Sequence, residues 1–181
     1  VIIATYYRFK VLYDLLNQFS KQTILPYEVI VIDQTPEDER KEDIVSLYKN
    51  KLPLKYYSFK EPSITKPRNF GARKSKGDIL LICDDDIVIN DNFLESHIRV
   101  MQEENVDVVN GATTTKDKLP ESYPWDSKIM DPVRYFLAAP NFKWSGMMLG
   151  VSSCNVSIKR ELFIESGGFD EKLPRMVDFE L

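Results

Sequence analysis

The chain has 181 residues, of which 43% are hydrophobic and 29% are charged, a balance typical of a globular domain and not of a disordered or fibrous chain. Its 24 basic and 28 acidic side chains leave a net charge of −4, which disfavours a nucleic-acid partner. Two cysteines fit a reducing compartment, and a single histidine weakens any multi-histidine metal site or catalytic triad. The length fits one domain, and no apolar run is long enough to span a bilayer.

Short β-branched runs alternate along the chain with segments whose apolar residues recur at helical spacing. In chain order we expect a strand at 1–5, a helix at 9–22, a strand at 28–33, a helix that opens with the acidic turn after Pro36 and continues through Leu47, a strand at 55–59, a helix at 67–76 closed by Gly77, a strand at 79–83, a helix at 91–104, strands at 106–109 and 151–158, and a helix at 160–166. The chain ends at Leu181 without a stop signal, so we expect a fragment that lacks its C-terminal part.

This alternation predicts βαβ crossovers and a mostly parallel sheet covered by helices on both faces, which is a three-layer α/β sandwich. Ligands bind outside the carboxyl ends of the strands in such sheets, where Asp33-Gln34 and Asp84-Asp85-Asp86 stand. Residues 114–150 break the pattern with aromatic residues scattered among prolines. Those aromatics either stack on a sugar or another flat ligand or pack a long loop onto the sheet.

Three consecutive aspartates directly follow the most apolar strand. In an extended segment Asp84 and Asp86 point to one side and Asp85 to the other, and same-side carboxylates raise each other's pKa unless a cation intervenes. Carboxylate oxygens without nearby histidine or cysteine ligands favour Mg²⁺ or Mn²⁺, which complete their shell with substrate phosphates. The alternative is a solvated acidic turn that caps the following helix.

A cationic segment lies just upstream of these aspartates. Lys66 and Arg68 stand at the start of an expected helix, where backbone N–H groups already favour anions. A diphosphate held between this helix start and a metal on Asp86 would use both groups. The alternative for Arg68 is a surface cation on an exposed helix turn.

These features resemble a family 2 glycosyltransferase of GT-A fold over nearly the whole chain. The matching segments are Ala4-Thr5-Tyr6-Tyr7-Arg8, Leu15-Leu16 through Gln22-Thr23, Glu28-Val29-Ile30-Val31-Ile32-Asp33, Arg68-Asn69-Phe70-Gly71 with Gly77-Asp78, Gly167-Gly168-Phe169-Asp170-Glu171 and Asp178-Phe179-Glu180-Leu181. Each segment alone is weak, but six in the right order and spacing are strong.

The resemblance implies a role for each matching residue. It assigns the catalytic base to Asp178 and the metal to Asp86. It implies nucleotide-sugar binding by Thr5, Tyr6, Asp33, Gln34, Arg68, Asn69, Asp84 and Asp85, with Tyr6 and the end of the second strand at the nucleobase, Arg68 and Asn69 along the nucleotide, and Asp84 and Asp85 near the ribose.

Three positions depart from the family pattern. Gln34 stands where a second aspartate is usual, and an amide that can rotate to donate or accept predicts weak discrimination between nucleobases. Val177 replaces the glutamate beside the catalytic aspartate, and Tyr7 replaces an asparagine. None of these changes removes the expected metal ligand or the expected base.

The implied activity is transfer of a sugar from a nucleotide-diphosphate-sugar to an acceptor hydroxyl on a sugar, glycan or lipid-linked molecule. With Mg²⁺ or Mn²⁺ on Asp86 and Asp178 as the only base, one displacement inverts the anomeric configuration. Residues 1–113 would form the nucleotide-sugar-binding half of the domain and residues 114–181 the acceptor-side half. We expect a cytoplasmic protein, placed at the inner face of the membrane where segments outside this chain attach it peripherally.

Other functions fit less well. A non-catalytic nucleotide-sugar-binding module of the same fold is the main alternative, favoured by Gln34 and Val177, whereas a nucleotidyltransferase leaves Gly167 to Glu171 unexplained. Cys83 beside three carboxylates is expected to be a buried strand residue, and His97 has no partner histidine at metal-binding spacing. No glycine-rich dinucleotide loop or Walker loop is present.

Overall fold

The computed structural model describes residues 1–40, 43–112 and 153–172. Its strands are β1 (Ile2–Thr5), β2 (Val29–Asp33), β3 (Leu54–Ser58), β4 (Ile79–Asp84), β5 (Val108–Asn110) and β6 (Asn155–Lys159). Its helices are α1 (Phe9–Phe19), α2 (Ile44–Tyr48), α3 (Lys66–Lys74), α4 (Phe93–Glu103) and α6 (Arg160–Glu165), with a 3₁₀ turn η1 at Glu37–Glu39. No described helix is long and apolar enough to cross a membrane.

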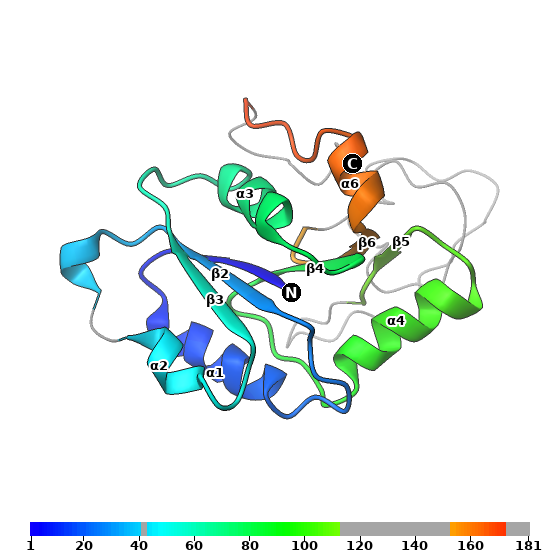
Figure 1. Cartoon of the computed structure of the whole chain (residues 1–181), viewed down its shortest axis with the longest axis horizontal. Helices are drawn as coiled ribbons and strands as arrows, with labels where there is room; N and C mark the ends of the chain where they lie inside the picture. Colours follow the sequence, from blue (N-terminus) through cyan, green and yellow to red (C-terminus); the bar gives the residue numbers. More distant parts are fainter. Residues whose placement is uncertain (41–42, 113–152, 173–181) are drawn as a thin grey trace, which may run out of the picture.

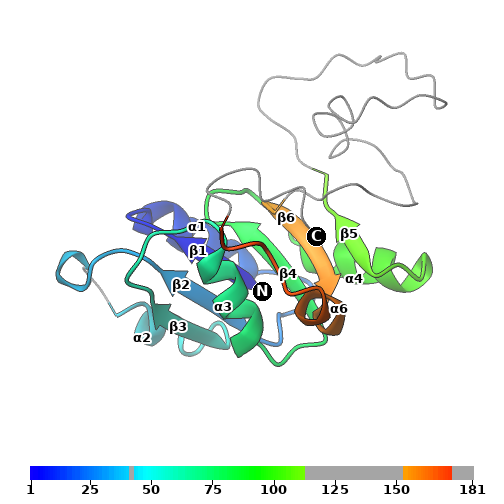
Figure 2. The same ribbon diagram turned by 90° about the horizontal axis from the view of Figure 1, so that it is seen from above.

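One six-stranded sheet in the order β3-β2-β1-β4-β6-β5 forms the centre of the protein. The first four strands are parallel, and the helical crossovers between them confirm the alternation expected from the sequence. Strand β6 pairs antiparallel with both β4 and β5, so the strand that follows residues 114–150 lies between two strands that precede them (Figure 2). The fifth expected strand, β5, therefore joins the sheet through its antiparallel pairing with β6 and does not pair directly with β4.

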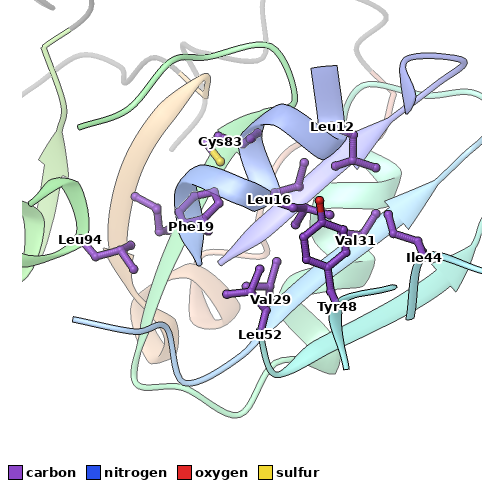
Figure 3. Close-up of a cluster of buried hydrophobic side chains, with 13 residues drawn as sticks. Leu12, Leu16, Phe19, Val29, Val31, Ile44, Tyr48, Leu52, Cys83 and Leu94 are labelled. Atoms are coloured by element: carbon purple, nitrogen blue, oxygen red, sulfur yellow. The ribbon is translucent and has the colours of Figure 1, made fainter. Parts of the chain in front are cut away.

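Helices cover both faces of this sheet, with α1 and α2 on one side and α3 and α6 on the other (Figure 1). Alternate strand residues supply the two cores, because successive side chains of a strand point to opposite faces. Ile3, Val29 and Val31 pack against α1 in the first core (Figure 3), whereas Ile2, Ile30 and Ile32 pack in the second core with Ala72 of α3 and Phe163 of α6. The three-layer α/β sandwich expected from the sequence is confirmed.

Three helix boundaries differ from the sequence expectation. The helix expected through Gln22 ends at Phe19, and the acidic turn after Pro36 is the separate turn η1, because α2 begins only at Ile44, where the Asp43 carboxylate accepts hydrogen bonds from the amides of Val45 and Ser46. Helix α3 ends at Lys74 and is followed by Ser75 in an extended conformation, so Gly77 is not its closing residue. Local sequence signals mark such boundaries only to within a few residues.

The aspartates after β4 do not cap the next helix. Helix α4 begins at Phe93, beyond the turn that contains Asp85 and Asp86. The Leu94 amide at its start donates instead to Gln22 Oε1 at 3.0 Å, and Gln22 Nε2 donates to the Asn90 carbonyl at 2.7 Å. The helix-capping alternative for the three aspartates is therefore wrong.

Gly71 sets how closely α3 approaches the sheet. An alanine Cβ at this position would lie 2.7 Å from Ile2 Cγ2 and 2.8 Å from Ile32 Cδ1, both in buried strand side chains. Because overpacking of a filled core costs about 1–3 kcal/mol, Gly71→Ala should lower the free energy of unfolding by that amount in urea denaturation.

Gly77→Ala is the matched control, because its new Cβ would meet the Ile79 carbonyl oxygen only at an ordinary 3.6 Å. Its free energy of unfolding should stay within about 0.5 kcal/mol of the wild-type value. Equal stability of the two variants would show that α3 is not held against β1 and β2 at this glycine.

Candidate functional site

Three adjacent strands end in polar side chains at one edge of the sheet. Thr5 of β1 lies opposite Asp33 of β2, and Ala4 lies opposite Asp84 of β4. After β1 the chain adds β2 and β3 on one side of β1, and then returns to add β4 on the other side of β1. This is the topological switch point, where ligands bind in parallel α/β sheets.

Asp85 is the buried member of the aspartate triplet. Its Oδ2 accepts a hydrogen bond from Thr5 Oγ1 at 2.7 Å, and its Oδ1 lies 3.1 Å from Arg8 Nη1. Burial raises the pKa of this carboxyl, while the Thr5 hydrogen bond and the Arg8 charge oppose that rise. Asp85 therefore ties the end of β4 to β1 and to the loop before α1.

Asp84 and Asp86 are the exposed members, with side chains 38% and 43% accessible against 5% for Asp85. This agrees with the alternation expected from the sequence. A different arginine pairs with each of them: Arg68 Nη2 lies 2.5 Å from Asp84 Oδ1, and Arg8 Nη2 pairs with Asp86 Oδ2. The intervening cations that the triplet requires are therefore these two guanidinium groups.

Arg68 projects from the first turn of α3 and is nearly buried. Its Nη1 donates to the Ile64 carbonyl at 2.5 Å, while its Nε is buried without a hydrogen-bond partner among the described residues. A buried unsatisfied donor costs about 1–3 kcal/mol. Arg68 is therefore a nearly buried guanidinium held at the end of β4, and the surface alternative for this residue is wrong.

Asp33 is completely buried and serves as the centre of a polar network. Its carboxylate accepts from the Thr35 amide at 2.8 Å and from the Tyr56 hydroxyl at 2.5 Å, with Arg40 Nε at 3.8 Å. Burial and the hydrogen bond to Asp33 raise the pKa of Tyr56. Both oxygens of Asp33 are thus engaged in holding the loop after β2.

Gln34 is oriented by a backbone donor. The Ser63 amide donates to Gln34 Oε1 at 2.6 Å, and the Gln34 amide donates to the Thr5 carbonyl at 3.0 Å. Because an N–H group must meet the oxygen of the side-chain amide, the NH₂ group takes the other position. The free rotation behind the expected weak base discrimination is therefore restricted, because the Gln34 side-chain oxygen is held by the Ser63 amide.

Tyr6 and Tyr7 form an exposed aromatic pair after β1, with ring centroids 4.6 Å apart. Tyr7 has φ = 58°, a conformation that is uncommon for a bulky residue and that asparagine adopts more readily. It is held there by the bond from its amide to Thr35 Oγ1 at 2.9 Å and by its hydroxyl bond to Glu39, which raises the pKa of Tyr7 to about 12. The positive φ thus fits the asparagine that the family resemblance implies at this position.

Asn69 is turned away from the strand ends toward Phe169. It accepts from the Phe169 amide at 3.0 Å, and its Nδ2 donates to the Phe169 carbonyl at 2.8 Å and to Glu171 Oε1 at 3.1 Å. Gly168 has φ = 73°, and a Cβ there would lie 2.6 Å from Asn69 Oδ1. The positive φ and this close approach explain why position 168 is a glycine. The hydrogen bonds show that Asn69 holds the segment 167–171 onto α3.

Two residues set aside in the sequence are structural. Cys83 is buried in β4, and burial raises the pKa of its thiol. His97 lies buried between Asn155 Oδ1 at 3.0 Å and Ser157 Oγ at 2.8 Å, where burial lowers its pKa. Asp178, Val177 and the aromatics of 114–150 lie outside the described residues.

The sequence resemblance pointed to most of these positions but not to their partners. Arg8 entered only as the last residue of a matching motif, and Arg40, Tyr56 and Ser63 were not singled out. Their bonds join residues 5 to 78 positions apart. Three consecutive carboxylates require cations nearby, and this requirement is the sequence feature that could have pointed to Arg8.

The sequence is similar to a known protein family and to several known proteins. The sequence model of glycosyl transferase family 2 matches residues 1–167. An uncharacterized glycosyltransferase, YwdF of Bacillus subtilis, is 33% identical over 105 residues, which are 58% of this chain and 37% of that protein. The poly(ribitol-phosphate) beta-N-acetylglucosaminyltransferase TarS of Staphylococcus aureus is 30% identical over 149 residues, which are 76% of this chain and 26% of TarS. This chain thus spans well under half the length of both relatives.

Solved structures share the fold. The crystal structure of S. aureus TarS 1–349 superimposes with a TM-score of 0.72 at 23% identity, over 98% of this chain and 51% of that one. The mannosyltransferase PcManGT of Pyrobaculum calidifontis, in complex with GDP-Man and Mn²⁺, superimposes with a TM-score of 0.67 at 18% identity, over 99% of this chain and 49% of that one. The expected GT-A fold is confirmed.

Proposed function

We propose that this chain, which belongs to glycosyl transferase family 2, is the donor-binding part of an enzyme that moves a sugar from a nucleoside diphosphate to an acceptor hydroxyl. The observation that carries the proposal is the switch-point cluster, in which Arg8 and Arg68 pair with Asp84, Asp85 and Asp86. Guanidinium groups bind phosphate oxygens in a bidentate manner. The cluster therefore offers donors to a diphosphate bound at this edge of the sheet.

The donor class is supported by relatives of the same fold. The TarS fragment 1–349 has been solved in complex with UDP and with UDP-GlcNAc, and PcManGT in complex with GDP-Man. We infer a nucleotide-sugar donor for this chain as well. The exposed Tyr6 and Tyr7 rings and the oriented Gln34 amide would lie on the nucleobase side, and Arg68 on the diphosphate side.

The residues present fit a divalent metal bound together with phosphate. Among the described residues no group of three or more metal-binding side chains exists that could hold an ion alone. Mg²⁺ and Mn²⁺ sites need only one or two carboxylates, because waters and substrate phosphates complete the shell. Asp86, assisted by Asp84, would hold the ion, which supplies positive charge to the leaving diphosphate.

Arg68 contributes to the same step from the protein. As the bond from the anomeric carbon to the diphosphate breaks, negative charge grows on the phosphate oxygens, and a donor already fixed in place stabilises it without reorganising. Arg68 meets this requirement because Ile64 and Asp84 hold its guanidinium. Asn69 acts at a distance, since it anchors the segment that leads toward Asp178.

We assign the proton transfer to Asp178 on the strength of the family pattern. The acceptor hydroxyl would attack the anomeric carbon and pass its proton to this carboxylate while the nucleoside diphosphate leaves from the other face. One such displacement inverts the anomeric configuration. A non-catalytic donor-binding module would keep the switch-point cluster and lack this step.

Two aspartate variants of the full-length protein separate these functions. Asp178→Asn should lower sugar transfer at least about 10²-fold and leave the nucleotide Kd nearly unchanged, because a general base acts only as the proton moves. Asp86→Asn should weaken both transfer and Mn²⁺-dependent nucleotide binding, measured by calorimetry. Asp14→Asn, the same change on the exposed face of α1, should alter neither.

A wild-type rate in Asp178→Asn would place the base elsewhere. Absence of transfer by the wild type with any nucleotide-sugar, despite tight nucleotide binding, would favour the binding module. Equal nucleotide affinity with Mn²⁺ and with EDTA would contradict the metal assignment.

Gln34 gives a prediction for the nucleobase. Because the Ser63 amide occupies the Gln34 side-chain oxygen, this side chain would offer a nucleobase its NH₂ group, so bases with a carbonyl oxygen at that point, uracil and guanine, should bind better than cytosine and adenine, which carry amino groups there. One hydrogen bond of about 1.4 kcal/mol corresponds to a tenfold difference in Kd. UDP or GDP should therefore bind about tenfold more tightly than CDP and ADP in calorimetry, and Gln34→Met should remove the difference. Equal binding of UDP and CDP by the wild type would contradict this assignment.

A further inference from the structure

Arg8 forms an ion pair with Asp86, the carboxylate that would hold the proposed metal. Its Nη2 pairs with Asp86 Oδ2, while its Nη1 lies 3.1 Å from Oδ1 of the buried Asp85. We propose that Arg8 is a built-in counter-cation that keeps divalent metal off Asp86 until a diphosphate draws it away, so that metal and nucleotide bind cooperatively. This inference rests on the proposed function and adds a role for Arg8 within the site.

The position of Arg8 allows such an exchange. It is the N-cap residue of α1, its side chain makes no capping bond, and that side chain is 48% exposed. Exposed ion pairs contribute only about 0–1 kcal/mol, so the bond to Asp86 is easily replaced. Asp85 is fixed by Thr5 and remains as a tether, which keeps the guanidinium beside the crevice after Asp86 is released.

Charge explains why the exchange needs a nucleotide. Three carboxylates against two guanidinium groups leave one net negative charge at the strand ends. A divalent ion that arrives alone must break the Arg8–Asp86 pair and then lie beside a freed guanidinium of like charge. A diphosphate gives that guanidinium a new bidentate partner and adds ligands for the ion, so each ligand lowers the cost of binding the other.

Arg68 does not share this freedom. Its side chain is 9% exposed, and the Ile64 carbonyl and Asp84 hold two of its nitrogens. It can stabilise phosphate without moving, whereas Arg8 can exchange one anion for another. Arg68 thus serves as a fixed phosphate-binding group, and Arg8 as a cation that changes its partner.

Mn²⁺ binding tests the proposal without any measurement of activity. Free Mn²⁺ is followed by electron paramagnetic resonance in the full-length protein, with and without UDP or whichever nucleoside diphosphate the wild type binds. We expect Arg8→Gln to bind Mn²⁺ alone at least about tenfold more tightly than the wild type. The factor by which nucleotide strengthens Mn²⁺ binding should be at least about tenfold smaller in Arg8→Gln, and the factor by which Mn²⁺ strengthens nucleotide binding should fall equally.

Two further variants control for charge and folding. Arg73, in the last turn of α3, forms another exposed ion pair with Glu171. Arg73→Gln removes the same charge there and should behave as the wild type. Arg8→Lys keeps the charge but cannot bridge two carboxylates in the same way, so its affinity for Mn²⁺ alone should lie between those of the wild type and Arg8→Gln. Unchanged thermal unfolding of the variants shows that they fold.

The proposal is overturned if Arg8→Gln binds Mn²⁺ alone no more tightly than Arg73→Gln, or if the coupling between Mn²⁺ and nucleotide is unchanged. Different results would contradict the proposed function itself. In that case the wild type binds no nucleoside diphosphate with or without Mn²⁺, or Asp86→Asn leaves Mn²⁺ binding as it was.

Discussion

Strand β4 ends in three carboxylates beside the end of β1, and much of the site exists to balance their charge. Arg8 reaches them from the start of α1, Arg68 from the first turn of α3, and Thr5 donates from β1 to the buried Asp85. Parallel strand order brings these groups together, because the carboxyl ends of β1, β3 and β4 and the amino ends of α1 and α3, which follow β1 and β3, lie at one edge of the sheet. The positive ends of those helices add to the same field.

Around this cluster, the polar side chains that match the family pattern mostly hold loops in place. Asp33 organises the loop after β2 through Thr35 and Tyr56, Ser63 orients Gln34, and Asn69 clasps Phe169. Such supporting bonds matter for catalysis because fixed donors stabilise developing charge without reorganising. The loops at the strand ends are thus held by side chains whose partners lie in other elements.

Periodicity and composition were enough to predict the sheet, its two helical layers and the edge at which Thr5, Asp33 and Asp84 come together. They could not predict that β6 separates β4 from β5, because that pairing joins segments on either side of residues 114–150. Nor could they assign the partner of Arg8 or the inward turn of Asn69, since Arg8 and Asp86 are 78 positions apart and Asn69 and Phe169 are 100 apart. The end of α3 was missed because Gly77 offers a stop signal that the helix does not reach.

We infer that the edge of the sheet at the ends of β1 and β4 binds a metal–diphosphate unit. Paramagnetic Mn²⁺ added with UDP to isotope-labelled protein would locate that unit through the broadening of nearby amide signals in nuclear magnetic resonance. We expect broadening at Arg8, Arg68 and Asp84 to Asp86, which reverses with EDTA. Broadening centred on the hollow at the amino ends of β2 and β3, lined by Tyr27 and Lys49 among others, would contradict it.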